Sequence, residues 1–364
     1  MKDEEVFGKE VFMKTAVFYG KGDIRVEKRP MPTAGPGQMV VKIDVVGICG
    51  TDVEFYKTGI TPPFAKSPLI LGHENCATVY QVGEGVTKFK VGDRVLCGPP
   101  AHCPEDCEPC RHGRTNICIH AFPRTAGLGQ YDGGYAEYML IHDVEHTMIV
   151  PVPEGVSAEE AVLFDVICVA IHAVRNSQFR FGDDVVVSGT GPIGLSAIQI
   201  LKAAGANKVI ALGTNSAKEP LLKSYGADFF INSKECEDLA GEIRRILGKE
   251  TGADVVYECA GNTVSLYNCI YSCVKPGGQV NVVGTIQAPM SNIVPGQIAS
   301  AEPNIQISFT YTEEDVKIYL DMLALGKLHF PDMVTGVVSL DECVEKVFAS
   351  DRKGQIKELI NPAL

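Results

Sequence analysis

Four cysteines lie close together in the sequence and have the spacing of a metal-binding loop. They follow the pattern C-x3-C-x2-C-x7-C and are Cys103, Cys107, Cys110 and Cys118. Four thiolates so close in sequence can complete a tetrahedron around Zn²⁺ with no open position, which is typical of a structural zinc site. The intervening residues include prolines, Gly113 and several charges, so metal binding rather than burial would fold this segment. Two disulfides are the alternative, and they require an oxidising compartment.

A glycine-rich segment points to a dinucleotide cofactor. Its six residues are Gly189, Thr190, Gly191, Pro192, Ile193 and Gly194. The segment follows the β-branched run Val185–Ser188 and leads into an apolar helical pattern over Leu195–Ala204. In that position the glycines permit a tight turn and let a pyrophosphate approach the helix N-terminus, where N–H groups favour an anion. A plain strand-turn-helix, with the glycines serving only the turn, is the alternative.

The residues after the next predicted strand indicate which dinucleotide is bound. In NAD enzymes an acidic residue about 20 positions past the glycine motif accepts a hydrogen bond from the ribose 2′-OH. Here the strand Lys208–Leu212 is followed by Gly213, Thr214 and Asn215, which leave room for a 2′-phosphate and offer donors. Lys218 could add positive charge. NADP(H) is therefore favoured, and NAD(H) stays open because no arginine lies within 213–218.

A cysteine and a histidine in the first part of the chain are candidates for a second metal site. Cys49 lies in the segment G-I-C-G-T-D and His73 in G-H-E, each at the end of a β-type run with glycines beside it. Such positions suit ligands presented at a cleft, and thiolate and imidazole both bind zinc. An inert core cysteine and a structural histidine are the alternative interpretation, because the two residues are far apart in sequence.

The elements that must position these residues change character along the chain. Up to about Pro153, short β-type runs are broken by glycine and proline, which predicts an all-β or barrel-like domain. The runs are Thr15–Phe18, Val40–Val46, Thr78–Val82 and Arg94–Cys97. From about Ser157, β-branched runs alternate with helix-compatible stretches, which is typical of βαβ units and a parallel sheet. These runs are Val185–Ser188, Lys208–Leu212, Asp228–Ile231, Asp254–Glu258 and Gln279–Val283.

The pattern loosens again after about Glu302. We expect a helix over Glu313–Leu325 and a final strand over Gln355–Ile360, and we expect this tail to return to the first domain. The fold class is thus α/β, and the predicted division is 1–157, 158–305 and a C-terminal segment 306–364. Met1–Phe12 is a charged extension ahead of the first strand, to which we assign no function.

Length and charge limit the class of protein. A chain of 364 residues exceeds one typical core and is expected to form two domains. Its net charge of −12 at pH 7 disfavours nucleic acid and anionic membranes as partners. No apolar run approaches the roughly eighteen residues of a membrane helix, and no apolar region near Met1 suggests export. We therefore expect a cytoplasmic protein in a reducing compartment, which favours zinc over disulfides for the four cysteines.

Together these motifs resemble those of the zinc-dependent medium-chain alcohol dehydrogenases, in particular the sorbitol, threonine and secondary-alcohol dehydrogenases. The resemblance extends from about Met13 to the C-terminus. It rests on Cys49–Asp52, Gly72–Glu74, the four-cysteine segment, Gly133–Tyr138 and Gly189–Gly194. It implies a GroES-like, β-rich catalytic domain and a Rossmann domain with a doubly wound parallel sheet. It also implies two zinc ions per chain, a small alcohol or ketone substrate, and a homodimer or homotetramer.

The resemblance implies roles for the residues around the second zinc ion. Cys49 and His73 would be catalytic zinc ligands, with Glu74 beside the metal or joining it. The third ligand would be Asp165, chosen over Cys168 by its place in the family's pattern. An aspartate in so apolar a run would be costly to bury, which also indicates a metal or cationic partner. A carboxylate at the start of a helix is the alternative role for Asp165.

The resemblance also implies a path for the alcohol proton. In such enzymes zinc polarises the substrate oxygen while a hydride moves between the alcohol carbon and the nicotinamide. Thr51 would pass the proton onward, and Glu54 would receive it where relatives often carry a histidine. A simple turn hydroxyl is the alternative for Thr51.

The chain departs from its relatives at several positions. Ala77 replaces a glycine, and the cysteine segment begins C-x3-C rather than C-x2-C. Thr310–Tyr311 stands where sorbitol-type enzymes tend to have Arg-Tyr, which weakens the case for a sugar alcohol. Gly213–Asn215 and Tyr225 resemble the NADP-dependent bacterial secondary-alcohol dehydrogenases, which places Tyr225 among the cofactor-binding residues. Those relatives have an arginine in place of Asn215 and commonly lack the cysteine segment.

The sequence therefore predicts a zinc-dependent oxidoreductase that interconverts a secondary alcohol or polyol and its ketone with NADP(H) or NAD(H). One alternative is a non-catalytic zinc and dinucleotide binder, such as a redox sensor or a structural relative. Another is a zinc-free quinone reductase of the same superfamily, which would lack the ligands and the cysteine segment. The residues that argue against the non-catalytic binder are Cys49, Thr51, His73, Glu74 and Asp165.

Overall fold

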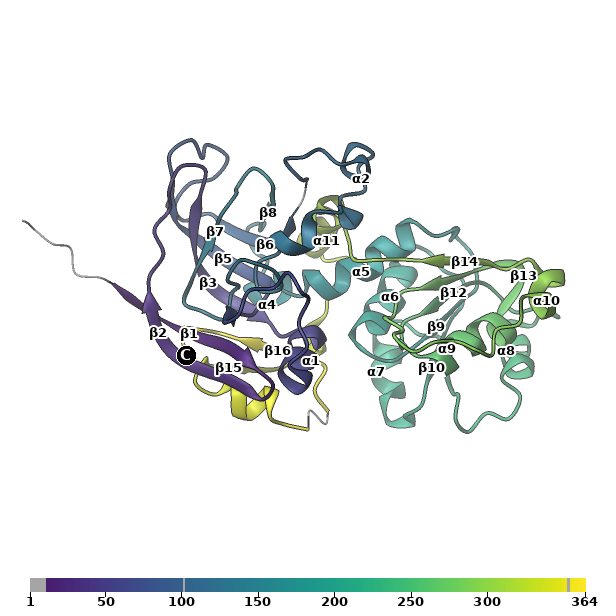
Figure 1. Cartoon of the computed structure of the whole chain (residues 1–364). Coiled ribbons are helices and arrows are strands. Elements are labelled where there is room, and N and C mark those ends of the chain that lie inside the picture. The colour runs from purple at the N-terminus through teal and green to yellow at the C-terminus, as the bar shows by residue number, and fades with distance from the viewer. Residues whose placement is uncertain (1–10, 101, 352–353) are drawn as a thin grey trace, which may run out of the picture. The chain divides into compact units, whose positions relative to one another are not determined.

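A computed structural model describes residues 11–100, 102–351 and 354–364 of the chain (Figure 1). Its contacts divide into two compact units, one of Met1–Leu163 with Phe330–Leu364 and one of Phe164–His329. The three-segment division drawn from the sequence stays a prediction of domain organisation. Of the predicted N-terminal extension, residues 1–10 lie outside the described residues, whereas Phe12 already belongs to the first strand, so the extension is shorter than expected.

The first unit consists mainly of β-strands, because its β-branched runs bury alternate or successive side chains against one core. A three-stranded sheet has the order β2-β1-β4, and a seven-stranded sheet has the order β15-β16-β3-β5-β6-β8 with β7 paired to β3. The strands are β1 (Phe12–Gly20), β2 (Asp23–Pro30), β3 (Met39–Gly47), β4 (Leu69–Ile70), β5 (Glu74–Val82), β6 (Arg94–Pro100), β7 (Tyr138–Ile141), β8 (Thr147–Pro151), β15 (Val334–Val338) and β16 (Lys357–Ile360).

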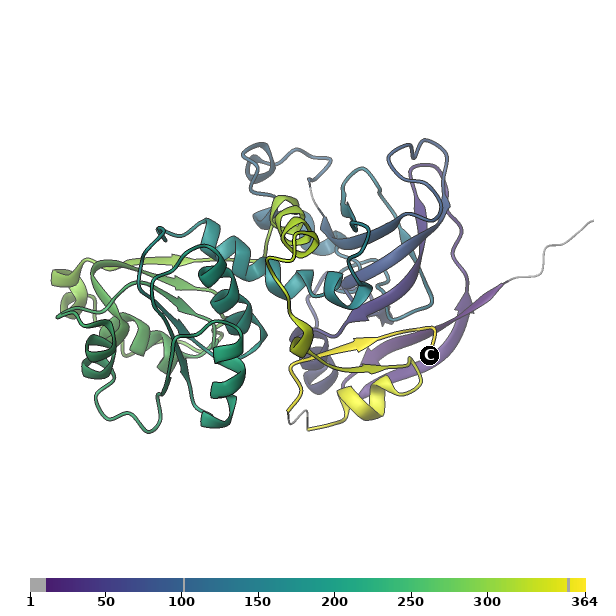
Figure 2. The same cartoon turned by 180° about the vertical axis from the view of Figure 1, so that it is seen from behind.

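Helices in the first unit are short and lie in the connections between strands. They are α1 (Gly50–Thr58), α2 (Glu108–Arg111), η1 (Thr115–Ile117), α3 (Ala121–Arg124), α4 (Ala158–Ala161), η5 (Pro331–Met333) and η6 (Val344–Phe348). Figures 1 and 2 both show the C-terminal strands β15 and β16, in yellow, among the purple N-terminal strands of this unit. Strand β16 pairs with β3, so the end of the chain completes the sheet that carries the first candidate ligands.

The second unit contains a parallel six-stranded sheet of order β11-β10-β9-β12-β13-β14, which confirms the predicted α/β class. The strands are β9 (Val185–Ser188), β10 (Val209–Gly213), β11 (Phe229–Asn232), β12 (Ala253–Glu258), β13 (Val274–Val282) and β14 (Asn304–Ile307). The helices are α5 (Phe164–Arg175), α6 (Pro192–Ala203), η2 (Ser216–Lys218), α7 (Glu219–Ser224), α8 (Leu239–Leu247), α9 (Thr263–Asn268), η3 (Cys269–Cys273), α10 (Pro295–Ile298), η4 (Ala299–Ala301) and α11 (Glu313–Ala324).

Both faces of this sheet are covered, so its central strands are buried throughout. One face packs against α8, α9 and η3 through a single apolar cluster, and α6 contacts strands β9 and β10 without contributing to that cluster. The strand order reverses direction between β9 and β12. In open parallel sheets, ligands bind at the carboxyl ends of the strands at such a reversal. The glycine-rich segment begins directly after β9, at this point.

No helix within the described part of the chain has both the length and the apolar character needed to cross a membrane.

Candidate catalytic and cofactor sites

The four-cysteine segment forms a compact thiol cluster in the first unit. Cys107 precedes α2, Cys110 lies within it and Cys118 follows η1, so two short helical turns bring the thiols toward Cys103. The four sulfur atoms lie within 4.8 Å of one another, and all four side chains are buried free thiols.

The thiols of this cluster differ in their ionisation, because burial raises the pKa of Cys110 to about 12 and also raises that of Cys118, whereas the pKa of Cys107 is lowered. Burial acts to raise the pKa of Cys107, but backbone N–H donors of Cys110 and Ile119 outweigh it, and the pKa is lowered to about 6. The N–H of Cys107 also donates to Cys103 Sγ at 3.3 Å, and that of His120 donates to Cys118 Sγ at 3.4 Å. Four converging sulfur atoms with such donors fit a tetrahedral zinc ion.

A second group of candidate ligands lies at the edge of the β3–β5 sheet. Cys49 is the N-cap residue of α1, two residues after β3, and His73 directly precedes β5, whose first residue is Glu74. Antiparallel pairing places Gly47 opposite Glu74, which brings the two segments together. Ligand atoms of Cys49, His73 and Glu74 lie within 4.8 Å of one another. The structure thus brings Cys49 close to His73 and Glu74, although Glu74 lies 25 positions after Cys49 in the sequence.

A buried carboxylate supports this group from behind. Asp52 is fully buried, accepts a hydrogen bond from the backbone N–H of Cys49 at 3.1 Å, and accepts another from Tyr135 Oη at 2.7 Å. Its other oxygen lies 3.6 Å from His73 Nδ1. Burial acts to lower the pKa of His73, but Asp52 and Cys49 outweigh it and raise that pKa well above its ordinary value. Within the described residues, neither His73 Nδ1 nor Asp52 Oδ1 has a hydrogen-bond partner.

These observations test whether a metal ion fits. A thiol, an imidazole and a carboxylate converge, one imidazole nitrogen is buried without a partner, and a second carboxylate is placed to orient the ring. That donor set is the one that zinc takes in catalytic sites, where a carboxylate beside the histidine fixes the ring. The residues present therefore fit zinc.

The predicted proton-relay residues lie on the exposed side of α1. Thr51 Oγ1 is 3.7 Å from Cys49 Sγ, and both Thr51 and Glu54 are exposed. The threonine therefore lies next to the candidate ligand, and the glutamate follows it by about one helical turn.

Asp165 belongs to the second unit, where it is the second residue of α5. Tyr311 Oη donates a hydrogen bond to Asp165 Oδ1 within that unit. The other residue that the sequence offered, Cys168, is fully buried, and its burial raises its pKa well above the ordinary value. The choice of Asp165 over Cys168 as a zinc ligand stays a prediction from the resemblance.

The glycine-rich segment has the geometry of a dinucleotide loop, and each glycine has its own reason. Gly189 has a φ of +120°, and a Cβ there would lie 2.6 Å from the backbone nitrogen of Ala260. A Cβ at Gly194 would lie 2.0 Å from the carbonyl oxygen of Gly189, because α6 starts close against the loop. Gly191, the N-cap of α6, has open space within 4 Å of its Cβ position. The helix N-terminus is thus accessible to an anion.

The residues predicted to contact the adenosine end lie at the carboxyl end of β10. Gly213 packs so closely that a Cβ would lie 2.5 Å from Thr190 Cγ2, and Lys218 Nζ donates to the carbonyl oxygen of Thr190 at 3.0 Å. Thr214 and Asn215 are exposed, and the Asn215 carbonyl caps η2. Lys218 therefore lies beside the glycine-rich loop.

Three further predicted residues differ in their surroundings. Tyr225 is buried at the C-terminal end of α7, and Pro192 and Ile193 form the first turn of α6. Tyr225 thus packs in the interior of the second unit, and its assignment to the cofactor stays a prediction.

Sequence reasoning missed Asp52, Tyr135, Lys357 and Glu258. Asp52 was visible three residues after Cys49, the spacing at which an acidic side chain bonds back to the N-cap. Glu258 ends β12 and accepts hydrogen bonds from the N–H groups of Ala260 and Gly261, so it shapes the turn that Gly189 touches. For Lys357, the only signal was a lysine in a short terminal strand that also contains leucine and isoleucine.

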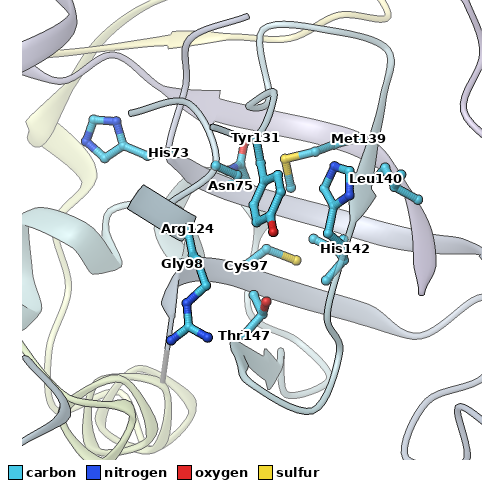
Figure 3. A pocket seen from close by; sticks show the side chains of 12 residues that line it. His73, Asn75, Cys97, Gly98, Arg124, Tyr131, Met139, Leu140, His142 and Thr147 are labelled. Carbon is cyan, nitrogen blue, oxygen red and sulfur yellow. The ribbon is translucent and has the colours of Figure 1, made fainter. Parts of the chain in front are cut away.

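A small cavity lies within the first unit, and the candidate ligand His73 forms part of its wall (Figure 3). Its walls include His73, Asn75, Cys97, Arg124, Tyr131 and His142. The rings of Tyr131 and His142 stack with their centroids 4.1 Å apart. The figure shows the His73 ring turned away from the other labelled side chains. The cavity holds about 20 Å³, which is room for about one water molecule, so it is too small for an alcohol substrate.

Comparisons with known proteins agree with this geometry. The sequence pattern described as "Alcohol dehydrogenase GroES-like domain" matches residues 35–154, and the one described as "Zinc-binding dehydrogenase" matches residues 192–324. The chain is 33% identical to sorbitol dehydrogenase of Bacillus subtilis over 334 residues, which cover 91% of each chain. It is 32% identical to D-xylulose reductase A of Aspergillus niger over 350 residues, which cover 94% of this chain and 95% of the relative.

A solved structure is similar to this chain over nearly its whole length. It is a zinc-binding dehydrogenase from Sinorhizobium meliloti 1021 bound to NADP, with a TM-score of 0.87 and 27% identity. The match covers 97% of this chain and 100% of that chain. The predicted combination of a GroES-like domain with a Rossmann-type sheet is confirmed by these matches.

Proposed function

The chain belongs to the zinc-dependent medium-chain alcohol dehydrogenase family, an oxidoreductase family acting on CH–OH donors, and we propose that it interconverts a secondary alcohol or polyol and its ketone using NADP(H) and two zinc ions. The observation that carries the proposal is the convergence of Cys49, His73 and Glu74 in front of the buried Asp52. The non-catalytic binder is not favoured, because the named relatives are enzymes, a sorbitol dehydrogenase and a D-xylulose reductase.

In this proposal Cys49, His73 and Asp165 hold the catalytic zinc ion, and the four-cysteine cluster holds the structural one. When bound, zinc supplies an electrophile that favours the ionised form of a substrate hydroxyl, and the nicotinamide supplies the hydride acceptor. Asp52 orients the His73 ring through its nearby oxygen.

The chain's own residues then manage the proton and the cofactor. Thr51 Oγ1, beside Cys49, takes the proton of the substrate hydroxyl, and the exposed Glu54 accepts it on the way to solvent. The N–H groups at the start of α6 bind the pyrophosphate, with Gly189 and Gly194 holding the loop against the helix.

NADP(H) is proposed over NAD(H) because the end of β10 carries no carboxylate. Gly213, Thr214 and Asn215 leave donors and space there, and Lys218 brings a positive charge beside the loop. A relative of similar fold binds NADP. The cytoplasmic location and the homodimeric or homotetrameric state are part of the proposal and rest on the sequence alone.

The test is a panel of nicotinamide reductions by the zinc-loaded protein. Open-chain secondary alcohols, cyclic alcohols, polyols and threonine would each be offered with NAD⁺ and with NADP⁺. Turnover of secondary or cyclic alcohols with NADP⁺ is the expected result. Turnover of polyols only with NAD⁺ would show that the Gly213–Asn215 and Thr310 positions had been misinterpreted. No turnover with any alcohol would contradict the proposed reaction.

A further inference from the structure

Lys357 is a charged residue in a strand where every side chain is buried. Strand β16 runs Lys357–Ile360, and Lys357 is only 3% exposed. Its ammonium forms an ion pair with the fully buried Glu74 carboxylate and donates to the carbonyl oxygen of Ile48 at 3.2 Å. A buried ammonium is costly unless it is paired in this way, so the position has a specific requirement for charge.

The contacts of Lys357 join the two segments that carry the candidate ligands. Ile48 directly precedes Cys49, and Glu74 directly follows His73. Strand β16 (Figure 1) is locked to the first of these segments, because the N–H of Ile48 donates to Glu358 O at 3.0 Å. On the other side, a Cβ at Gly47 would lie 1.8 Å from Glu74 Oε2. The Glu74 carboxylate is therefore confined between the backbone of Gly47 and the ammonium of Lys357.

Glu74 has a chemistry that could close the proposed catalytic site. One of its oxygens lies within 4.8 Å of both Cys49 Sγ and a ring nitrogen of His73. Carboxylate oxygen is an ordinary zinc ligand, and a zinc site with four protein ligands is closed, whereas a catalytic site keeps one position open. Whatever holds Glu74 back therefore decides which kind of site is formed.

We propose that Lys357 is a positioning residue that keeps the Glu74 carboxylate off the catalytic zinc and so leaves the fourth position open to the substrate oxygen. This inference rests on the proposed function, because it assumes zinc at Cys49 and His73. The ammonium offers the carboxylate a competing partner of opposite charge at direct contact, in a buried site where such attraction is strong.

We expect Lys357→Met to bind zinc more tightly and yet to turn over more slowly. Methionine has a similar length and no charge, so Glu74 is released to the metal. We expect zinc to be bound about tenfold more tightly at this site, while kcat falls by about 10- to 100-fold, the range typical when a partner of a metal ligand is removed. Lys357→Arg keeps the charge and is expected to keep most of the zinc affinity and turnover of the parent protein.

Three quantities would be measured for each variant. They are the zinc dissociation constant from chelator competition, the absorption spectrum of the cobalt-substituted protein, and kcat. Lys346→Met is the matched control, because Lys346 pairs with Glu342 on the surface of the same unit. The double variant Lys357→Met/Glu74→Gln buries no unpaired charge and is therefore expected to fold. Because its amide is a weaker ligand, it should return zinc affinity and kcat toward the parent values and restore the parent cobalt spectrum.

Two results would overturn the positioning role. One is a Lys357→Met protein that binds zinc more weakly than the parent, which is what a merely structural clamp predicts. The other is a double variant whose zinc affinity and kcat stay at the values of Lys357→Met. Failure of the proposed function is recognised separately, because the parent protein itself would then bind no zinc at Cys49 or turn over no alcohol.

Discussion

At the scale of single residues, the site depends on a few side chains that their neighbours hold in place. Cys49 and His73 are both close to the Asp52 carboxylate, which is held in place by Tyr135 Oη and the Cys49 N–H. This arrangement keeps the imidazole oriented while leaving Cys49 partly accessible. The chemistry of these residues therefore supports the proposed zinc site, whereas it does not identify the substrate.

Replacing Cys49 by serine tests the catalytic ligand directly. A neutral hydroxyl is a much weaker zinc ligand than a thiolate, so we expect Cys49→Ser to lose about one zinc ion per chain and nearly all turnover. The dinucleotide loop belongs entirely to the second unit, so the dissociation constant for NADPH, followed by fluorescence titration, should stay within about twofold of the parent value.

Cys76→Ala is the control for that experiment. Cys76 is a fully buried thiol in β5 of the same unit, and it belongs to none of the groups of possible metal ligands in the described chain. It should keep both zinc and turnover. Retention of turnover by Cys49→Ser would refute the zinc mechanism.

At the scale of secondary-structure elements, the junction of β9 and α6 shows how backbone packing makes a cofactor site. The helix begins directly behind a loop whose Gly189 carbonyl leaves no room for a side chain at Gly194. The same close approach leaves the N-terminus of α6 uncovered above Gly191. Two glycines three positions apart therefore have opposite surroundings, and substitutions at them should have different effects.

We expect Gly194→Ala and Gly191→Ala to separate packing from cofactor binding. A Cβ at Gly194 forces the loop and helix apart, which should destabilise the protein by roughly 1–3 kcal/mol and also weaken NADPH binding. Gly191 has φ −85°, which alanine adopts readily, and meets no protein atom, so Gly191→Ala should keep the melting temperature and weaken only NADPH binding. If titration gives Gly191→Ala and the parent protein the same NADPH affinity, the cofactor does not bind at this loop.

The four-cysteine segment is a second element whose fold depends on a site. Its core within the described residues consists of the four thiols themselves, with Ala121 packed against them. We expect Cys110→Ser to lose about one zinc ion per chain and to make residues near 103–118 susceptible to proteolysis, because metal binding supplies the folding energy. Zinc content and limited proteolysis measure this. Cys236→Ser, outside every candidate metal group of the described chain, should behave like the parent, and equal zinc content in both variants would disprove the assignment.

At the scale of the whole molecule, an ionic network ties the two ends of the second unit together. Asp315, the N3 residue of α11, lies 2.8 Å from His172 Nδ1 and 2.6 Å from Arg175 Nη1, both on α5. It also accepts a hydrogen bond from the N–H of Thr312 at 2.8 Å. Burial acts to raise the pKa of Asp315, but His172, Thr312 and Arg175 outweigh it and lower the pKa to about 2. The network thus links residues 143 positions apart.

The lowered pKa predicts how stability depends on pH. Because the folded-state pKa lies below the unfolded value, the stabilisation is fully present above about pH 4 and is lost as pH falls through the folded pKa. Asp315→Asn should cost on the order of 2 kcal/mol at pH 7 and progressively less below about pH 4. Urea unfolding at a series of pH values measures this. Asp321→Asn, an exposed change on the same helix, is the control, and a cost that does not vary with pH would contradict the assignment.

The sequence by itself determined the features that depend on near neighbours. The cysteine cluster and the glycine-rich loop were predicted in place because their members lie within one short segment, where spacing and backbone sterics leave few arrangements. Five of the six strands of the second unit were predicted, because buried parallel strands read as apolar runs, although β13 begins at Val274 rather than Gln279. Strand β14 (Asn304–Ile307) was missed, and its side chains are mostly exposed. The resemblance to a family supplied the roles of Thr51 and Asp165, which no local pattern could assign.

Only the tertiary structure decided which distant residues share a site. Lys357 meets Ile48 across 309 positions, since the C-terminal strand pairs with β3, and no property of the short strand around Lys357 indicates that pairing. Tyr135 reaches Asp52 across 83 positions in the same way. Such contacts follow from sheet register, which is fixed by the burial of whole faces rather than by any one residue. The ligands could therefore be named from the sequence, but the groups that orient and restrain them could not.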